Sequence, residues 1–274
     1  MRIGFIGVGN MGGAILKGAI RSGFIQTNQV SIFDKNPETI NTITNEFSVK
    51  VEKNSQELTE VCDVIILGVK PIILNSVLSE ISSFSSNKVI ISIAAGWSLT
   101  MLINALDNKE AQIVRVMPNT PALVSAGFTA ICEESTFTPS TKEWVINLFS
   151  CLGMVSVLSE TAIDAVIAVS GSSPAYVFMF IDALADGAVK QGMSRQLAIQ
   201  AAAQAVLGSA KMVLDTQIHP SELKDQVCSP GGTTIEAVAT LEKNGFKGAV
   251  ISAMENCANK SKIMQTELEL KWRK

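Results

Sequence analysis

Aromatic residues and histidine are scarce in this 274-residue chain: Phe, Trp and Tyr make up 5%, and His219 is its one histidine. Charged residues account for 17%, without a long run of either sign, and the formal net charge is -3. Nucleic-acid binding is therefore not expected, because it needs a basic surface. His219 precedes Pro220 and is predicted to start a helix. No Ser-His-Asp set, pair of catalytic carboxylates or metal-binding cluster stands out, so we expect no metal.

The five cysteines are scattered, odd in number and form no C-x-x-C pair. This pattern predicts reduced thiols and hence a cytoplasmic protein. No targeting segment is apparent, because the apolar run Ile3–Val8 is too rich in glycine for a signal peptide. The longest uncharged stretch, Ala165–Ile181, contains Ser-Gly-Ser-Ser-Pro at residues 170–174. We expect a turn to break this stretch, which argues against a membrane span.

Hydrophobic residues make up 47% of the chain, and its length predicts two domains. Up to residue 159, short β-branched runs alternate with amphipathic stretches, which is the pattern of an α/β fold. The runs are apolar throughout, as in parallel strands with helices on both faces. They are Ile3–Ile6, Val30–Phe33, Val64–Val69, Val89–Ile93 and Ile113–Met117. Residues 1–159 are thus predicted to form a Rossmann-like dinucleotide-binding domain with a doubly wound parallel sheet.

From residue 160 the β-branched runs stop and Ala-rich segments follow, so residues 160–274 are predicted to form an all-helical domain. The features below assign substrate binding and dimerisation to this domain. The segments are Thr161–Val169, Pro174–Gln191, Gln196–Gln217, Thr233–Asn244 and Gly248–Leu268. Several are apolar on nearly every face, and a helix of this kind must be buried. A second subunit is the natural place for so much apolar surface, and we expect an intertwined homodimer. The alternative is a self-contained bundle packed on the first domain.

A glycine motif, Gly7-Val8-Gly9-Asn10-Met11-Gly12, follows the first predicted strand and opens a helix. G-x-G-x-x-G in this place is the fingerprint of dinucleotide binding. Gly7 permits the tight turn, Gly9 lets the backbone approach the pyrophosphate, and Gly12 lets the helix lie close to the strand. A glycine-rich turn without a ligand is the alternative.

The second predicted strand is followed by Asp34 and Lys35, where dinucleotide-binding domains discriminate the adenine ribose. A carboxylate there accepts a hydrogen bond from a 2′-hydroxyl and repels a 2′-phosphate, whereas Lys35 could hold that phosphate. Because Asp34 disfavours that phosphate by like-charge repulsion, we expect that NADPH works but that NADH is used comparably or better than is usual. Solvated turn residues without a ligand are the alternative.

Three further strands end in segments that should reach the cofactor, since ligands bind at the carboxyl ends of the strands. These segments are Gly68–Pro71, Ile93–Gly96 and Met117–Pro121. The last of them places Asn119 and Thr120 beside the expected nicotinamide. Each segment alone could be a structural turn.

In the helical half, the pair Gly231-Gly232 joins a short helix to a helix that begins near Thr233. Backbone N–H groups at such a helix start can bind a small carboxylate. The alternative is an ordinary helix start with Thr233 as its N-cap. A second polar segment, residues 170–176, places Pro174 in the first turn of a helix, where its missing N–H does no harm.

Together these segments resemble the pyrroline-5-carboxylate reductase family over essentially the whole chain. The matching motifs are F-I-G-x-G-N-M at Phe5–Met11, V-K-P at Val69–Pro71, A-A-G at Ala94–Gly96, M-P-N-T-P at Met117–Pro121, S-G-S-S-P-A-Y at Ser170–Tyr176, D-A-L-A-D-G at Asp182–Gly187 and L-K-D-Q-V-x-S-P-G-G-T-T at Leu223–Thr234. The last motif is highly specific.

The resemblance implies reduction of Δ1-pyrroline-5-carboxylate to L-proline with NADP(H) or NAD(H), the last step of proline biosynthesis. It also implies intertwined homodimers that often associate into decamers. The residues that it places at the cofactor are Ile6, Gly7, Val8, Gly9, Asn10, Met11, Asp34, Asn54, Gly68, Val69, Lys70, Pro71, Ala94, Ala95 and Gly96, and Asn119 joins them from its position after a strand. The residues that it places at the substrate are Gln217, Gln226, Ser229, Gly231, Gly232, Thr233 and Thr234. Thr234 is the candidate catalytic residue, as a proton donor or relay to the ring nitrogen.

Two positions depart from the family pattern: Cys228 stands where members often have Ser or Thr, and Asp34 where members that prefer NADPH often have a small hydroxyl residue. These departures bear only on the cofactor preference. The nearest rival is the β-hydroxyacid dehydrogenase group, which uses a lysine in the helix after an S-G-rich turn, whereas Ser170–Met179 contains no lysine. A non-catalytic dinucleotide-sensing module is a further alternative.

Overall fold

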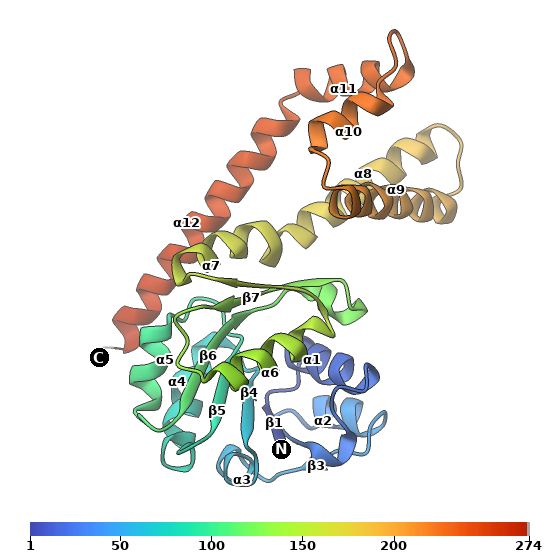
Figure 1. Cartoon of the computed structure of the whole chain (residues 1–274). Helices are drawn as coiled ribbons and strands as arrows, with labels where there is room; N and C mark the ends of the chain where they lie inside the picture. Colours follow the sequence, from blue (N-terminus) through green and yellow to red (C-terminus); the bar gives the residue numbers. More distant parts are fainter. Residues whose placement is uncertain (273–274) are drawn as a thin grey trace. The chain divides into compact units, whose positions relative to one another are not determined.

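The computed structural model describes residues 1–272 of the chain, which forms two compact units. The sheet unit comprises Met1–Ser172 together with the C-terminal residues from Cys257, and the helical unit comprises Ser173–Asn256. Figure 1 shows the strands and the helices of both units, coloured along the chain.

The sheet unit contains eight strands in the order β3-β2-β1-β4-β5-β6-β7-β8. The strands are β1 (Ile3–Ile6), β2 (Val30–Phe33), β3 (Lys50–Val51), β4 (Val64–Leu67), β5 (Val89–Ser92), β6 (Gln112–Met117), β7 (Gly127–Cys132) and β8 (Gly153–Leu158). β1 pairs in parallel with both β2 and β4, so the strand order reverses beside β1, where sheets of this type bind ligands. The five predicted strands are confirmed, with ends that agree to within about two residues.

The sheet is parallel except where β7 runs antiparallel to β6. Neither this antiparallel pair nor the strands β3 and β8 were predicted from the sequence. Residues 118–126, which connect β6 to β7 and contain a short 3-10 turn at Thr120–Val124, are too few for a parallel crossover of about a dozen residues. β8 then returns parallel to β7 and completes the edge of the sheet.

Helices cover both faces of the sheet, which confirms the doubly wound arrangement. They are α1 (Asn10–Arg21), α2 (Pro37–Thr44), α3 (Ser55–Val61), α4 (Pro71–Ile81), α5 (Leu99–Leu106), α6 (Pro139–Ser150) and α7 (Glu160–Val166). α1, α2 and α6 share a core with Phe5 and Ile66, while α3, α4, α5 and α7 share a second core with Ile6 and Ile65. Ile65 and Ile66 enter opposite cores because successive side chains of a strand alternate between the two faces.

The helical unit contains α8 (Ser173–Lys190), α9 (Arg195–Thr216), α10 (Pro220–Val227), α11 (Thr233–Lys243) and the first part of α12 (Phe246–Trp272). Its buried core is small and consists of Ala185, Ala198 and Ala202, where α8 packs against α9. Large apolar side chains remain exposed, and Met179 and Leu214 are 73% and 65% exposed. The unit by itself therefore leaves extensive apolar surface uncovered.

Two helical stretches, Glu160–Lys190 and Arg195–Thr216, are long and apolar enough to cross a membrane. Length and composition are the whole basis of this observation, and they do not distinguish a membrane span from a helix that packs inside a protein assembly.

The prediction that a turn breaks Ala165–Ile181 is wrong, because Ile167–Gly171 form a π-helical segment and the helix continues. The N–H of Ser172 donates to the carbonyl oxygen of Ile167 at 2.9 Å, which is the wider hydrogen bond of a π-helix. The Ser170 hydroxyl donates to the carbonyl oxygen of Val166 at 3.1 Å. The polar residues are thus accommodated within a helix.

The division into compact units differs from the change of sequence pattern at residue 160. α7 packs against the sheet through Ile163 and Val166, and Leu268 of α12 packs against the same core. Both segments are helical, as predicted from the pattern, but their apolar side chains pack against the sheet unit.

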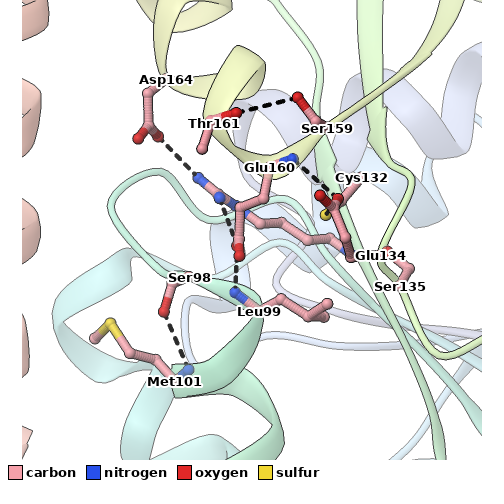
Figure 2. Close-up of polar contacts among 11 residues, drawn as sticks. Ser98, Leu99, Met101, Cys132, Glu134, Ser135, Ser159, Glu160, Thr161 and Asp164 are labelled. Carbon is pink, nitrogen blue, oxygen red and sulfur yellow. Dashed lines mark hydrogen bonds and ion pairs between the residues drawn. The ribbon is translucent and has the colours of Figure 1, made fainter.

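A buried arginine connects several elements of the sheet unit. Arg115, which lies on β6 and is 4% exposed, forms ion pairs with Glu160 at 2.7 Å and with Asp164 at 3.4 Å, both on α7. Glu160 Oε1 also accepts a hydrogen bond from the backbone N–H of Leu99, the first residue of α5, at 2.6 Å. In Figure 2, Glu134 accepts a further hydrogen bond from the N–H of Glu160. The strand β6 is thereby joined to the start of α5 and of α7.

The carboxylate of Glu134 extends this cluster to the end of β7. The thiol of Cys132 donates to Glu134 Oε2 at 3.2 Å, and burial raises the pKa of Cys132 to about 11, so the thiol stays protonated at neutral pH. The pKa of Glu134 is lowered, first by the hydrogen bond from its own backbone N–H and then by the thiol. Glu134 therefore remains ionised beside the N-terminus of α7, where negative charge is stabilising.

Arg115→Ala should lower the free energy of unfolding of the sheet unit by about 3–5 kcal/mol, because it leaves the partly buried carboxylates of α7 without their cation. Arg21→Ala, which removes an exposed ion pair with Glu46, should cost less than about 1 kcal/mol. Urea unfolding followed through the fluorescence of tryptophan, including the buried Trp97, measures both changes. Equal losses in the two variants would contradict a special role for Arg115.

Candidate functional site

The turn after β1 is defined by close contacts between three glycines. Gly7 has a φ of +89°, and its N–H donates to the carbonyl oxygen of Phe33 at 2.8 Å. A Cβ atom at Gly12 would lie 2.1 Å from the carbonyl oxygen of Gly7, and one at Gly68 would lie 2.3 Å from the same oxygen. Only glycine fits at these positions, so α1 and the end of β4 both approach the turn at backbone distance.

Gly9 differs from these glycines because a Cβ atom there would meet no protein atom within 4 Å. It is the N-cap of α1, has an ordinary φ of -65°, and provides no side-chain cap to the helix. Nothing in the fold therefore requires glycine at this position. The exposed N–H groups at the start of α1, without an acidic residue in the first turn, fit a diphosphate that needs this open space.

Asp34 has a structural role in the same turn. Its Oδ2 accepts a hydrogen bond from the N–H of Val8 and its Oδ1 accepts one from the N–H of Asn36, each at 2.9 Å. The carboxylate thus holds the glycine motif against the end of β2, while the side chain also lines the adjacent cavity. A substitution of Asp34 would therefore change the support of the loop as well as any contact with the ribose.

Two cavities flank the glycine motif, and their size suits part of a dinucleotide. The first, of about 320 Å³, is lined by seven predicted cofactor residues: Ile6, Gly7, Gly9, Asp34, Gly68, Val69 and Lys70. The second, of about 360 Å³, is lined by Val8, Gly9 and Asn10 on the side of α1. Ligand pockets commonly measure about 300–1,000 Å³. The sheet unit therefore brings most of the predicted cofactor residues together.

The other predicted cofactor residues line neither cavity. Asn54 caps α3, and its Oδ1 accepts from the N–H of Glu57 at 2.7 Å. Met11 and Pro71 lie in the first turns of α1 and α4. Residues Ala94, Ala95 and Gly96 follow β5, with a φ of +78° at Gly96. Their contacts with a cofactor stay predictions.

Asn119 is buried, and its side-chain amide forms hydrogen bonds within the protein through both its nitrogen and its oxygen. Nδ2 donates to the carbonyl oxygen of Ser170 at 3.0 Å, and Oδ1 accepts from the N–H of Phe128 at 2.8 Å. This amide joins the segment after β6 to the π-helical segment and to β7. The proposed position beside the nicotinamide stays a prediction.

The helical unit contains the second predicted site, in the turn between α10 and α11. Gly231 has a φ of +69°, and the N–H of Gly232 donates to the carbonyl oxygen of Ser229 at 3.0 Å. Gly232 is the N-cap of α11, and no side chain caps the helix. The alternative that Thr233 is the N-cap is therefore wrong. The first-turn N–H groups, left without a side-chain cap, fit a small anion such as a carboxylate.

The remaining predicted substrate residues lie around this turn in the chain. Gln217 ends α9 with a φ of +56°, and Gln226 is exposed on α10. Thr234 is half-buried in the first turn of α11. His219 caps α10, and its Nδ1 accepts from the N–H of Ser221 at 3.2 Å, which confirms it as a helix-start residue.

The residues of the first cavity that were not predicted from the sequence include Ser55, Ile73, Val77 and Glu80. Three of them lie on α4 at a helical spacing that places them on one side. That spacing was visible in the sequence, but which side of α4 faces the cavity depends on the packing of α3 and α4.

Two family models match the chain. Residues 160–264 match the model described as pyrroline-5-carboxylate reductase dimerisation, and residues 2–96 match the model described as NADP oxidoreductase, coenzyme F420-dependent. The first match begins at α7, at the place where the sequence pattern changes to helices.

Curated relatives match along almost the full length. Pyrroline-5-carboxylate reductase of Escherichia coli K12 is 50% identical over 261 residues, which covers 95% of this chain and 97% of that protein. The enzyme of the same name from Arabidopsis thaliana is 38% identical over 95% of this chain and 94% of that protein.

Solved structures agree with these relatives. The crystal structure of Plasmodium falciparum pyrroline carboxylate reductase with NADP bound has a TM-score of 0.88 and 34% identity, covering 97% of this chain and 98% of that one. The pyrroline-5-carboxylate reductase of Coxiella burnetii has a TM-score of 0.87 and 31% identity, covering 96% and 98%.

Gly9→Ala should weaken NADP⁺ binding at least tenfold while leaving the melting temperature nearly unchanged, because the added methyl group fills ligand space and meets no protein atom. Gly12→Ala should instead destabilise the fold by about 1–3 kcal/mol even without ligand, because its methyl group overlaps the backbone. Calorimetric titration with NADP⁺ and thermal unfolding separate the two effects. Wild-type affinity in Gly9→Ala would show that the glycine turn does not approach the phosphates.

Proposed function

The chain belongs to the pyrroline-5-carboxylate reductase family, and we propose that it reduces Δ1-pyrroline-5-carboxylate to L-proline in the last step of proline biosynthesis. The observation that carries this function is the 50% identity to the Escherichia coli reductase across 95% of the chain. It is supported by the cavities at the glycine motif and by the uncapped start of α11. The family assignment displaces the β-hydroxyacid dehydrogenase alternative.

The residues of the chain fit the two anionic groups that must be bound in this reaction, the cofactor diphosphate and the substrate carboxylate. In the sheet unit, the N–H groups at the start of α1 would bind the cofactor diphosphate, and Asp34 would hold the glycine motif in place. In the helical unit, the first-turn N–H groups of α11 would bind the substrate carboxylate. When bound, NADPH supplies the hydride that reduces the C=N bond.

The chain's main contribution to this reaction is orientation, because a protonated imine is already electrophilic. Binding the carboxylate would restrict the orientation of the ring, and positioning of this kind accounts for a large share of rate enhancement. Thr234, in the first turn of the same helix, would supply or relay the proton that the ring nitrogen needs.

NADP(H) is the cofactor, and we propose that NAD(H) also serves. Asp34 disfavours a 2′-phosphate by like-charge repulsion, while Lys35, which lines the same cavity, offsets it. The proposed site of action is the cytoplasm, which is supported by five cysteines that all remain free thiols.

The function is tested by mixing the protein with pyrroline-5-carboxylate and either NADPH or NADH. Loss of the reduced cofactor's absorbance together with formation of proline is the expected result. Cofactor binding without turnover would instead support a dinucleotide-sensing module.

Thr234→Ala should lower kcat by about 10²-fold, and the loss should grow above the pKa of the imine, where the neutral substrate depends on the protein for its proton. Thr234→Ser should retain much of the activity because it keeps the hydroxyl. Thr240→Ala, the same change two turns further along α11, serves as a control and should be nearly neutral. Steady-state rates as a function of pH test this, and wild-type rates for Thr234→Ala at all pH values would assign Thr234 to the helix start alone.

A homodimer through the helical unit is the proposed assembly, with a decamer as a further level. An apolar groove between α8 and α9 is lined by Phe180, Leu184 and Ala210, among others, and it offers a surface for a second copy. Light scattering should give at least twice the 29.2 kDa mass of the chain.

Ala210→Glu should weaken this assembly, because it places a charge in the apolar groove. Gln204→Glu, on the same helix but outside the groove, should leave the mass unchanged. A monomeric wild-type protein at micromolar concentration would contradict the proposal.

A further inference from the structure

The cavity of about 320 Å³ extends along α4 from the glycine motif to Glu80. Ile73, Val77 and Glu80 are spaced at i, i+4 and i+7, so they share one face of the helix. The first two side chains form an apolar wall, and the third ends that wall with a carboxylate. A wall of this kind matches a flat aromatic base that carries a polar group at its far edge.

The carboxylate of Glu80 is held in place by α3. Ser55, the first residue of that helix and 2% exposed, donates its hydroxyl to Glu80 Oε2 at 2.7 Å. Among the residues that the structure describes, Glu80 forms no ion pair and its Oε1 has no hydrogen-bond partner. One oxygen of the carboxylate is therefore positioned, and the other is left to accept a hydrogen bond from a ligand.

Purine bases carry either a hydrogen-bond donor or an acceptor at position 6, and a carboxylate distinguishes the two. Adenine carries an amino group that donates hydrogen bonds, whereas hypoxanthine and guanine carry a carbonyl oxygen that accepts them. An ionised carboxylate accepts hydrogen bonds and cannot donate them. A carboxylate aligned with position 6 therefore attracts the amino group of adenine and repels the oxygen of a 6-oxo purine, whose nearest donor, the N1–H, lies one ring atom away.

We propose that Glu80 accepts a hydrogen bond from the 6-amino group of the cofactor's adenine and thereby selects adenine over 6-oxo purines, with Ser55 as its positioning residue. This inference rests on the proposed function, in which a dinucleotide has its diphosphate at α1. From there the base lies along Ile73 and Val77, and its far edge reaches Glu80. Neither glutamate nor serine takes part in hydride transfer, so the contact acts on cofactor binding.

The test compares the binding of NADP⁺ with that of its hypoxanthine analogue, nicotinamide hypoxanthine dinucleotide phosphate, by calorimetric titration. The wild-type protein should bind NADP⁺ about 10- to 100-fold more tightly, the range of a hydrogen bond to a charged group. Glu80→Gln should reduce this ratio to within about threefold, because a carboxamide donates to the 6-oxo group as readily as it accepts from the amino group. Ser55→Ala should reduce the ratio partly.

Glu60→Gln is the matched control, because it makes the same change of charge at an exposed position on α3 outside the cavity. It should keep the wild-type ratio. If Glu80→Gln does not fold, the wild-type ratio and Ser55→Ala decide the question. Equal binding of the two dinucleotides by a wild-type protein that reduces pyrroline-5-carboxylate would overturn the role of Glu80 and leave the function intact. Failure to bind either dinucleotide would overturn both.

Discussion

The contact between the backbones of Gly7, Gly12 and Gly68 is the constraint on which the sheet unit depends. A Cβ atom at Gly12 or Gly68 would overlap the carbonyl oxygen of Gly7. Because all three lack side chains, the start of α1 lies at backbone distance from the ends of β1 and β4, at the carboxyl edge where sheets of this type bind ligands. Asp34 then fixes the loop from the side of β2 through the N–H of Val8. The two flanking cavities follow from this arrangement.

The two units differ in how much of their apolar surface they bury, and this difference bears on assembly. The sheet unit buries its strands between two layers of helices, with large side chains such as Phe5 and Phe149 fully buried. The helical unit buries three alanines and leaves residues such as Phe178 exposed. A unit with so small a core gains little from folding alone, so a second copy is the natural source of its stability.

Much of the fold could be predicted because its signals are local in the sequence. Continuous apolar runs identified five strands, and G-x-G-x-x-G identified the cofactor turn. The ion pairs of Arg115 depend on contacts between distant residues, which no local pattern encodes. Arg115, for example, lies 45 positions from Glu160. Glu80 was missed for the same reason, since its partner Ser55 lies 25 positions away on another helix.

The helices differ in how the N–H groups of their first turns are satisfied. α2, α3, α5 and α6 begin with Asn36, Asn54, Ser98 and Thr138, whose side chains accept hydrogen bonds from first-turn N–H groups. α4, α7 and α9 begin with Lys70, Ser159 and Ser194, whose side chains form no such hydrogen bond. α1 and α11 begin with Gly9 and Gly232, which have no side chain at all. A helix without a side-chain cap loses stability that a bound anion can restore. The diphosphate of the cofactor and the carboxylate of the substrate are the two anions that the reaction supplies. In the proposed reaction their binding would therefore complete the two helices, and it would need no cluster of basic side chains.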